Sequence, residues 1–157
     1  MAEAVLDACP LLSYLVCMPS MPDHGRARGV IVRAIRIAQR RDQRDVAQAS
    51  RIEAPYLSLI ETERRRPSPE YTQRLAAGLH VDAAILCGQI PVIRTLREAA
   101  ELTLPELADA LAIEPMRLER LERGLDLPDA DEIALLSRRL GVDPSVFDSP
   151  HPVDRAS

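Results

Sequence analysis

The sequence has no lysine: all 20 of its cationic residues are arginine. It also has no tryptophan and a single phenylalanine among 157 residues. A hydrophobic core must therefore be built from leucine, isoleucine, valine and alanine, which suits small helical domains. The lack of lysine has a chemical consequence, because the planar guanidinium of arginine binds a phosphate in a two-pronged way that an ammonium cannot.

Other features are scarce, and each excludes a class of protein. The three cysteines, Cys9, Cys17 and Cys87, have no metal-ligand spacing and predict reduced thiols in a cytoplasm. The three histidines are scattered, and no nucleophile–base constellation or phosphate-binding glycine loop is present, so we expect no enzyme, no metal and no cofactor. No window supplies the roughly 18 apolar residues of a membrane span.

The charge is distributed unevenly along the chain. The net charge of −4 argues against a nucleic-acid partner only if it is spread evenly. Residues 24–86 contain twelve arginines and seven acidic residues, whereas residues 87–147 contain seven arginines and twelve acidic residues. One half is therefore basic and the other acidic, and only the first half has the charge expected of a protein that binds DNA.

Residues 42–67 read as two short helices joined by a tight turn and followed by three consecutive arginines. Asp42 is expected to cap the first helix through its carboxylate, and Ile52 to be the buried anchor of the turn. The second helix is expected to begin near Pro55, where a missing N–H costs nothing. Leu57, Ile60 and Glu61 would then face inward, and this arrangement describes a helix-turn-helix. A further helix is expected before it, at about 29–41.

Residues 32–86 resemble the XRE, or Cro/cI-type, helix-turn-helix family. The recognition pattern Tyr56-Leu57-Ser58-x-Ile60-Glu61 and the loop Arg64-Arg65-x-Pro67-Ser68 carry this resemblance. It implies a partly buried ion pair between Arg36 and Glu61. It also implies contacts with double-stranded DNA, whose phosphates would be bound by Gln43, Arg44, Arg64, Arg65 and Arg66. The recognition helix would present Ala54, Pro55, Tyr56, Ser58 and Leu59 to the bases.

The sequence departs from the family pattern at two kinds of position. Ala54 and Pro55 replace polar residues that are often found at the start of the recognition helix, so direct hydrogen-bond readout is expected to be thin. Arg51 and Glu63 stand where the family commonly has glycine, and mild backbone strain is expected in those two turns. Neither departure changes the expected fold.

The pattern is then repeated. Residues 33–86 align with residues 94–147 without a gap, and the recurring residues are mainly core, cap and ion-pair positions, including a second pair, Arg97 and Glu122. We therefore predict an all-α chain of two tandem five-helix, lambda-repressor-like domains of the Cro/cI type. The predicted divisions are a tail at 1–25 that is disordered or partly ordered, a DNA-binding domain at 26–87, a linker at 88–91, an acidic second domain at 92–147 and a disordered tail at 148–157. Met18 or Met21 is an alternative start.

The two copies diverge at the positions that would face DNA. Gln43 corresponds to Leu104, and the arginine loop corresponds to Leu125-Asp126-Leu127. Acidic groups repel phosphates, so we predict that the second domain has lost or reduced its DNA binding. The side chains of Leu104, Met116, Leu125 and Leu127 are expected to be exposed and suggest a protein interface instead. The alternative keeps both domains on DNA through Arg117, Arg120 and Arg123.

The leading hypothesis is a sequence-specific transcriptional regulator, a repressor that binds DNA as a homodimer in a bacterial cytoplasm and is encoded by the bacterium or a phage. The second hypothesis is an antitoxin or adaptor whose residues 92–147 bind a partner protein, with DNA binding used for autoregulation. The two are compatible, because such antitoxins often repress their own operon.

Overall fold

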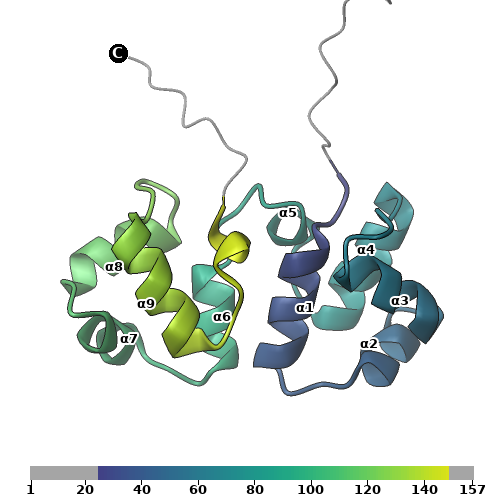
Figure 1. Cartoon of the computed structure of the whole chain (residues 1–157), viewed down its shortest axis with the longest axis horizontal. Helices are drawn as coiled ribbons and strands as arrows, with labels where there is room; N and C mark the ends of the chain where they lie inside the picture. The colour runs from purple at the N-terminus through teal and green to yellow at the C-terminus, as the bar shows by residue number, and fades with distance from the viewer. Residues whose placement is uncertain (1–24, 149–157) are drawn as a thin grey trace, which may run out of the picture.

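The computed structural model describes residues 25–148, and every regular element in that range is a helix. The first unit contains α1 (Gly29–Ala38), α2 (Gln43–Ala49), α3 (Ala54–Glu61), α4 (Pro69–Leu79) and α5 (Ala83–Leu86). The second contains α6 (Ile93–Ala99), α7 (Leu104–Leu111), α8 (Pro115–Glu122), α9 (Ala130–Leu140) and the 3₁₀ helix η2 (Pro144–Phe147). The predicted all-α fold with two tandem units is therefore confirmed (Figure 1). The predictions for residues 1–24 and 149–157 lie outside the described residues.

Helices α4, α5, α7 and α9 begin at side-chain caps, but one expected cap does not form. Ser68 and Asp82 accept backbone N–H groups at the starts of α4 and α5. Thr103 and Asp129 form complete capping boxes at the starts of α7 and α9. Asp42 is the exception: it has the extended backbone of an N-cap, but its side chain accepts no cap hydrogen bond. That carboxylate is exposed, and water can satisfy it in place of the helix.

The backbone repeats along with the sequence. Four non-glycine residues of the first unit have a left-handed φ, and each has a left-handed counterpart at the equivalent position of the second unit. The pairs are Arg40 with Glu101, Arg51 with Ala112, Glu63 with Gly124, and His80 with Gly141. The left-handed Arg40 also explains why α1 ends at Ala38 and not near Arg41. The turns at Arg51 and Glu63 are strained as predicted, because both hold a φ that glycine adopts more readily.

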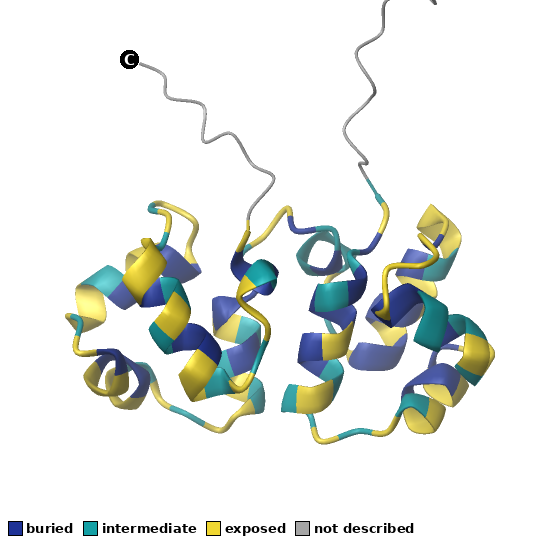
Figure 2. Cartoon of the chain, viewed as in Figure 1, coloured by how far each residue is buried: buried dark blue, intermediate teal, exposed yellow. Residues whose placement is uncertain are grey.

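The two units pack against each other through α1. This helix contacts α6 and η2, and buried side chains of both units form one apolar cluster. Figure 2 colours the buried residues of both units dark blue. The Arg28 guanidinium adds two hydrogen bonds across the junction, from its NH1 to the Asp148 carbonyl at 2.6 Å and from its NH2 to the Ser145 carbonyl at 3.0 Å. The pairs α2–α3 and α7–α8 consequently lie at opposite ends of the molecule (Figure 1).

Two smaller facts complete the fold. Ile52 is only half-buried, so the core between α2 and α3 is anchored by Val46, Leu57 and Ile60, which are fully buried, and not by the turn residue.

Among the described helices, the longest have 11 residues, and none qualifies as a membrane span.

Candidate nucleic-acid interface

Helix α3 divides its residues between the core and the surface. Leu57, Ile60 and Glu61 are buried, as their spacing predicts. Of the five residues expected to face DNA, Pro55 is exposed, while Tyr56, Ser58 and Leu59 are half-buried. Ala54 is half-buried and packs on the core, so its methyl group is less available than the sequence suggested.

A buried ion pair fixes α3 against α1. Arg36 donates from Nε to Glu61 Oε1 at 2.7 Å and from NH2 to Glu61 Oε2 at 2.9 Å. The side chain of Glu61 is 2% exposed and that of Arg36 is 14% exposed. Arg36 NH1 also donates to the Arg41 carbonyl, which holds the end of α1. The predicted pair therefore forms, and its geometry is the two-pronged one that makes arginine–carboxylate pairs strong.

The same carboxylate also fixes Gln43, the first residue of α2. Gln43 Nε2 donates to Glu61 Oε2 at 2.8 Å. Sequence reasoning assigned this side chain to a DNA phosphate and missed its bond to Glu61. The amide nitrogen is already used inside the protein, whereas the neighbouring Arg44 side chain is exposed. Glu61 thus ties the ends of α1, α2 and α3 into one network.

The arginine loop follows α3 and projects into solvent. Arg64, Arg65 and Arg66 are all exposed, whereas Pro67, which ends the loop, is buried. The Arg65 backbone N–H donates to the Leu59 carbonyl at 3.0 Å, so the loop folds back onto the end of α3. Within residues 25–148, the side chains of Arg64 and Arg65 form no ion pair with an acidic group. A stretch of positive charge therefore lies directly beside the outward face of α3.

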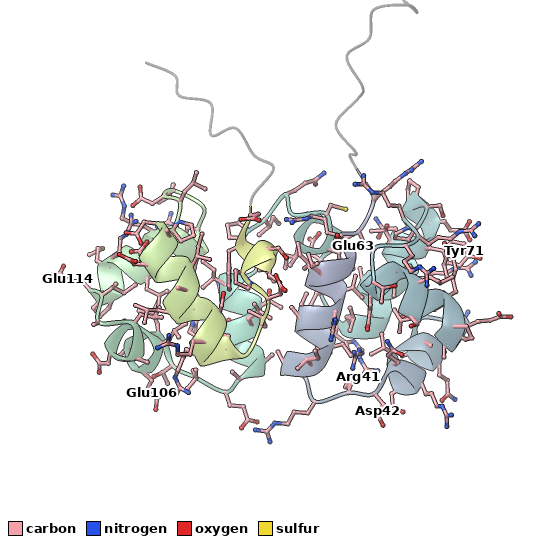
Figure 3. The ribbon with its side chains drawn as sticks, viewed as in Figure 1. Arg41, Asp42, Glu63, Tyr71, Glu106 and Glu114 are labelled. Atoms are coloured by element: carbon pink, nitrogen blue, oxygen red, sulfur yellow. The ribbon has the colours of Figure 1, made fainter. Side chains whose placement is uncertain are left out.

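Tyr56 is held by an aromatic partner that sequence reasoning missed. Its ring lies 5.1 Å from the ring of Tyr71 on α4, centroid to centroid, at an interplanar angle of 56°. The Arg74 guanidinium lies 5.2 Å from the Tyr71 ring centroid and also pairs with Glu70. Figure 3 labels Tyr71 at the outer end of the first unit. The two tyrosines belong to different helices, and neither helical spacing nor a known motif singles out their separation in the sequence.

The second unit repeats the ion pair but not the network around it. Arg97 donates from Nε and NH2 to the two carboxylate oxygens of Glu122, at 2.6 and 3.1 Å. Leu104 takes the place of Gln43 and supplies no donor to the carboxylate. Its side chain is half-buried against the core, so the expectation of an exposed Leu104 was wrong. A leucine at the start of α7 can turn onto neighbouring apolar side chains, which a glutamine amide would not do.

The arginines of α8 are bonded to nearby acids. Arg117 donates to both oxygens of Glu132, at 3.0 and 3.1 Å, and to Asp126 Oδ2 at 2.8 Å. Arg120 donates to both oxygens of Asp126, at 2.7 and 3.0 Å. The hydrogen bond from Arg120 lowers the pKa of Asp126, and the pKa of Arg120 is raised in return. Arg123 pairs more loosely with Glu119, at 3.7 Å.

Exposed apolar side chains lie beside this charged cluster. Met116 is 67% exposed, Leu125 is 54% exposed and Leu127 is 51% exposed, so three of the four predicted interface residues do face solvent. Figure 3 places Glu114, which precedes α8, at the far end of the molecule from Tyr71. This end is therefore distinct from the arginine loop of the first unit, both in position and in chemistry.

The described residues contain no group of three or more His, Cys, Asp or Glu side chains that could hold a metal ion. Cys87 is a free thiol next to the junction of the units, and its partial burial raises its pKa. Cys9 and Cys17 lie outside the described residues.

Two family models match the chain, one for each unit. A model described as "Helix-turn-helix" matches residues 32–86, and a model described as "Helix-turn-helix domain" matches residues 92–149. Comparison with curated proteins and with solved structures gave no significant match. The chain therefore carries two helix-turn-helix domains in tandem, in agreement with the Cro/cI-type resemblance, and such domains point to a regulator that binds DNA.

Proposed function

We propose that the chain is a sequence-specific, DNA-binding transcriptional regulator that places α3 of the first domain in the major groove. The observation that carries this proposal is the position of the arginine loop. Arg64, Arg65 and Arg66 are exposed directly after the outward-facing helix of a helix-turn-helix, where DNA phosphates would lie if α3 entered the groove. Neither an enzymatic activity nor a cofactor is part of the proposal.

The phosphate contacts would set the position of the domain on the duplex. The three loop arginines and Arg44 can each donate to phosphate oxygens, and these contacts supply affinity without reading sequence. Gln43 would contribute less than its position suggests, because its amide nitrogen is bonded to Glu61. Its main role would then be to hold the start of α2 against α3.

Base recognition would come from a small and mostly apolar set. Pro55 and Leu59 can contact thymine methyl groups, with a smaller contribution from Ala54, and the Ser58 hydroxyl can bond to a base edge. The Tyr56 ring is oriented by Tyr71, so its hydroxyl would reach a fixed point on a base or a phosphate. With so few hydrogen-bonding groups, much of the specificity would come from the shape and deformability of the DNA.

A repressor that works as a homodimer fits these features best. One recognition helix reads few base pairs, and proteins of this architecture gain specificity by pairing two helices across a palindrome. The apolar surface of Met116, Leu125 and Leu127 is available for self-association. Such a protein would act where the DNA is, in the cytoplasm of a bacterial host.

The same surface supports a second candidate function, that of an antitoxin or adaptor. Residues 92–147 would then bind another protein through these side chains while the first domain regulates transcription. If a stoichiometric partner co-purified with the parent chain but not with a Met116→Ser, Leu125→Ser, Leu127→Ser variant, this function would be favoured over simple dimerisation.

The DNA-binding role can be tested with a double variant and a matched control. Arg64→Ala with Arg65→Ala removes two loop arginines, whereas Arg138→Ala with Arg139→Ala removes two consecutive exposed arginines from α9 of the second domain. Binding to a labelled duplex would be followed by fluorescence anisotropy at about 50 mM and about 200 mM salt. We expect the loop variant to bind more weakly on every sequence and the α9 variant to bind like the parent.

The expected magnitude follows from counterion release. Each lost phosphate contact removes about 0.9 from the slope of log affinity against log salt. Two lost contacts should make the defect of the loop variant about twelvefold larger at the lower salt than at the higher one. Equal binding by the parent and the loop variant would refute the assignment.

A further inference from the structure

The second domain contains the cationic residues of a DNA-reading helix. In the gapless alignment of the two copies, Arg117 and Arg120 of α8 occupy the positions of Tyr56 and Leu59 on α3. Both lie on the part of the helix that faces outward, with side chains that are 34% and 53% exposed. By position and residue type alone, α8 is better equipped to bind DNA than α3.

These guanidinium groups are, however, bonded to acids, and one carboxylate, that of Asp126, contacts both of them. Asp126 accepts through both oxygens of its side chain: Arg120 contacts it twice and Arg117 once, all within 3.0 Å. A carboxylate held in this way by two arginines resembles a DNA phosphate between two arginines, since both are two-pronged contacts with an anionic oxygen pair. In the first domain the corresponding position is Arg65, which is exposed.

We propose that the second helix-turn-helix is a latent binding site for DNA phosphate, and that Asp126 keeps it closed by occupying Arg120, together with NH1 of Arg117, in place of the phosphate. The site requires no rearrangement of the fold. Its opening requires that the half-buried Asp126 leave Arg120, while Arg117 stays bonded to Glu132.

The other acids of this cluster have different roles. Glu132 also holds Arg117, but it is buried, and it completes the capping box at the start of α9 by accepting the Asp129 backbone N–H. Asp126 forms no cap and lies in the loop before α9. Both hydrogen bonds of the Arg120 side chain go to Asp126, whereas Arg117 keeps Glu132 and the Leu127 carbonyl if Asp126 is lost. Asp126 therefore controls Arg120 in particular.

A DNA phosphate can replace Asp126 at Arg120 on energetic grounds. An ion pair in contact with solvent contributes little net free energy, because water and salt screen it. A duplex offers a row of phosphates with condensed counterions that are released on binding, and a single aspartate offers no such release. What prevents binding in the parent is therefore the extra negative charge placed where a phosphate would lie. Removing it should convert repulsion into one new phosphate contact.

The test uses the full chain with Asp126→Ala and, as a control for net charge, Asp109→Ala, which removes an exposed acid from another helix, α7. Both are made in the Arg64→Ala, Arg65→Ala background, so that any gain in binding cannot come from the first-domain loop. Affinity for a labelled duplex is measured by anisotropy at about 50 mM and about 200 mM salt. One added phosphate contact predicts a gain over the Asp109→Ala control that is about 3.5-fold larger at the lower salt.

A further variant identifies the arginine. Adding Arg120→Ala to Asp126→Ala should abolish the gain, and Asp126→Arg, which restores the residue type of the first domain, should exceed Asp126→Ala. Asp126→Asn keeps the size of the side chain, and circular dichroism melts of all variants establish that they are folded. If folded Asp126→Ala and Asp126→Asn both bind no better than Asp109→Ala, the proposal is overturned. The parent with an intact loop tests the proposed function separately, so failure of one does not imply failure of the other.

Discussion

Replacing Glu61 with alanine should destabilise the first domain more than the loss of any exposed ion pair in the described part of the chain. In the parent, the carboxylate accepts two hydrogen bonds from Arg36 and one from Gln43, and its side chain is 2% exposed. Alanine removes all three acceptor contacts at once. It leaves a guanidinium that is 14% exposed with one remaining bond, to the Arg41 carbonyl.

The magnitude follows from the buried charge that remains. Removing one partner of a buried pair costs about 3–5 kcal/mol, because the other charge is desolvated without compensation. Glu61→Gln keeps the volume and one acceptor oxygen, so it should cost less than Glu61→Ala. The double variant Arg36→Met with Glu61→Met removes both charges and should recover most of the loss, since an apolar pair of similar volume is often neutral.

The second domain offers a matched control. Glu122 accepts from Arg97 with nearly the same geometry, but Leu104 supplies no third donor. Glu122→Ala should therefore cost less than Glu61→Ala by about 1 kcal/mol, the net contribution of a typical hydrogen bond. Urea denaturation followed by circular dichroism gives the free energy of unfolding of each variant. If Glu61→Ala lost less than about 1 kcal/mol, or if the double variant were as unstable as the single one, the reasoning from burial and charge would be refuted.

Two further predictions concern packing and reactivity. A Cβ at Gly78 would lie 2.1 Å from Ser50 Oγ and 2.9 Å from the Ser50 nitrogen. Gly78→Ala should therefore lower the free energy of unfolding, measured by urea denaturation, by about 1–3 kcal/mol. Adding Ser50→Ala should restore only part of this loss, because the Ser50 backbone nitrogen stays in place. Burial raises the pKa of Cys87, so less of it is in the reactive thiolate form. In a Cys9→Ser, Cys17→Ser chain at about pH 7.5, iodoacetamide should therefore alkylate Cys87 more slowly than free cysteine. A rate equal to that of free cysteine would contradict this prediction.

Much of the fold could be predicted because the sequence contains two copies of the same domain. The gapless alignment of the two copies matched caps, core positions and both ion pairs, and the structure confirms the pairs Arg36–Glu61 and Arg97–Glu122. Residues with a left-handed backbone also occur at equivalent positions of the two copies. For example, His80 and Gly141 end α4 and α9 with the same left-handed conformation. Local rules of capping and helical spacing are sufficient for such features, because they depend on residues close together in sequence.

The predictions that missed a contact concern side chains that can bond either to a group nearby in the sequence or to one on another helix. Asp42 was expected to cap α2, but its carboxylate faces water. Leu104 was expected at the surface but packs on the core. The bond from Gln43 to Glu61 was not foreseen, and the phosphate contact assigned to Gln43 stays a prediction. Spacing gives the face of the helix on which a residue lies. It does not give which neighbouring group competes best for that side chain.

The contact between the recognition helix and the helix that follows its loop shows how far this competition alters function. In the first domain the contact is made by Tyr56 with Tyr71, and at the same two positions of the second domain it is made by Arg117 with Glu132. An arginine in the reading position suggests a DNA contact when the sequence is read alone. In the structure this arginine is instead bonded to a glutamate on α9 and to an aspartate in the loop before it. These acids occupy the guanidinium group that would otherwise contact a phosphate. The capacity of a helix-turn-helix to bind DNA thus depends on the charges that its arginines already contact within the protein.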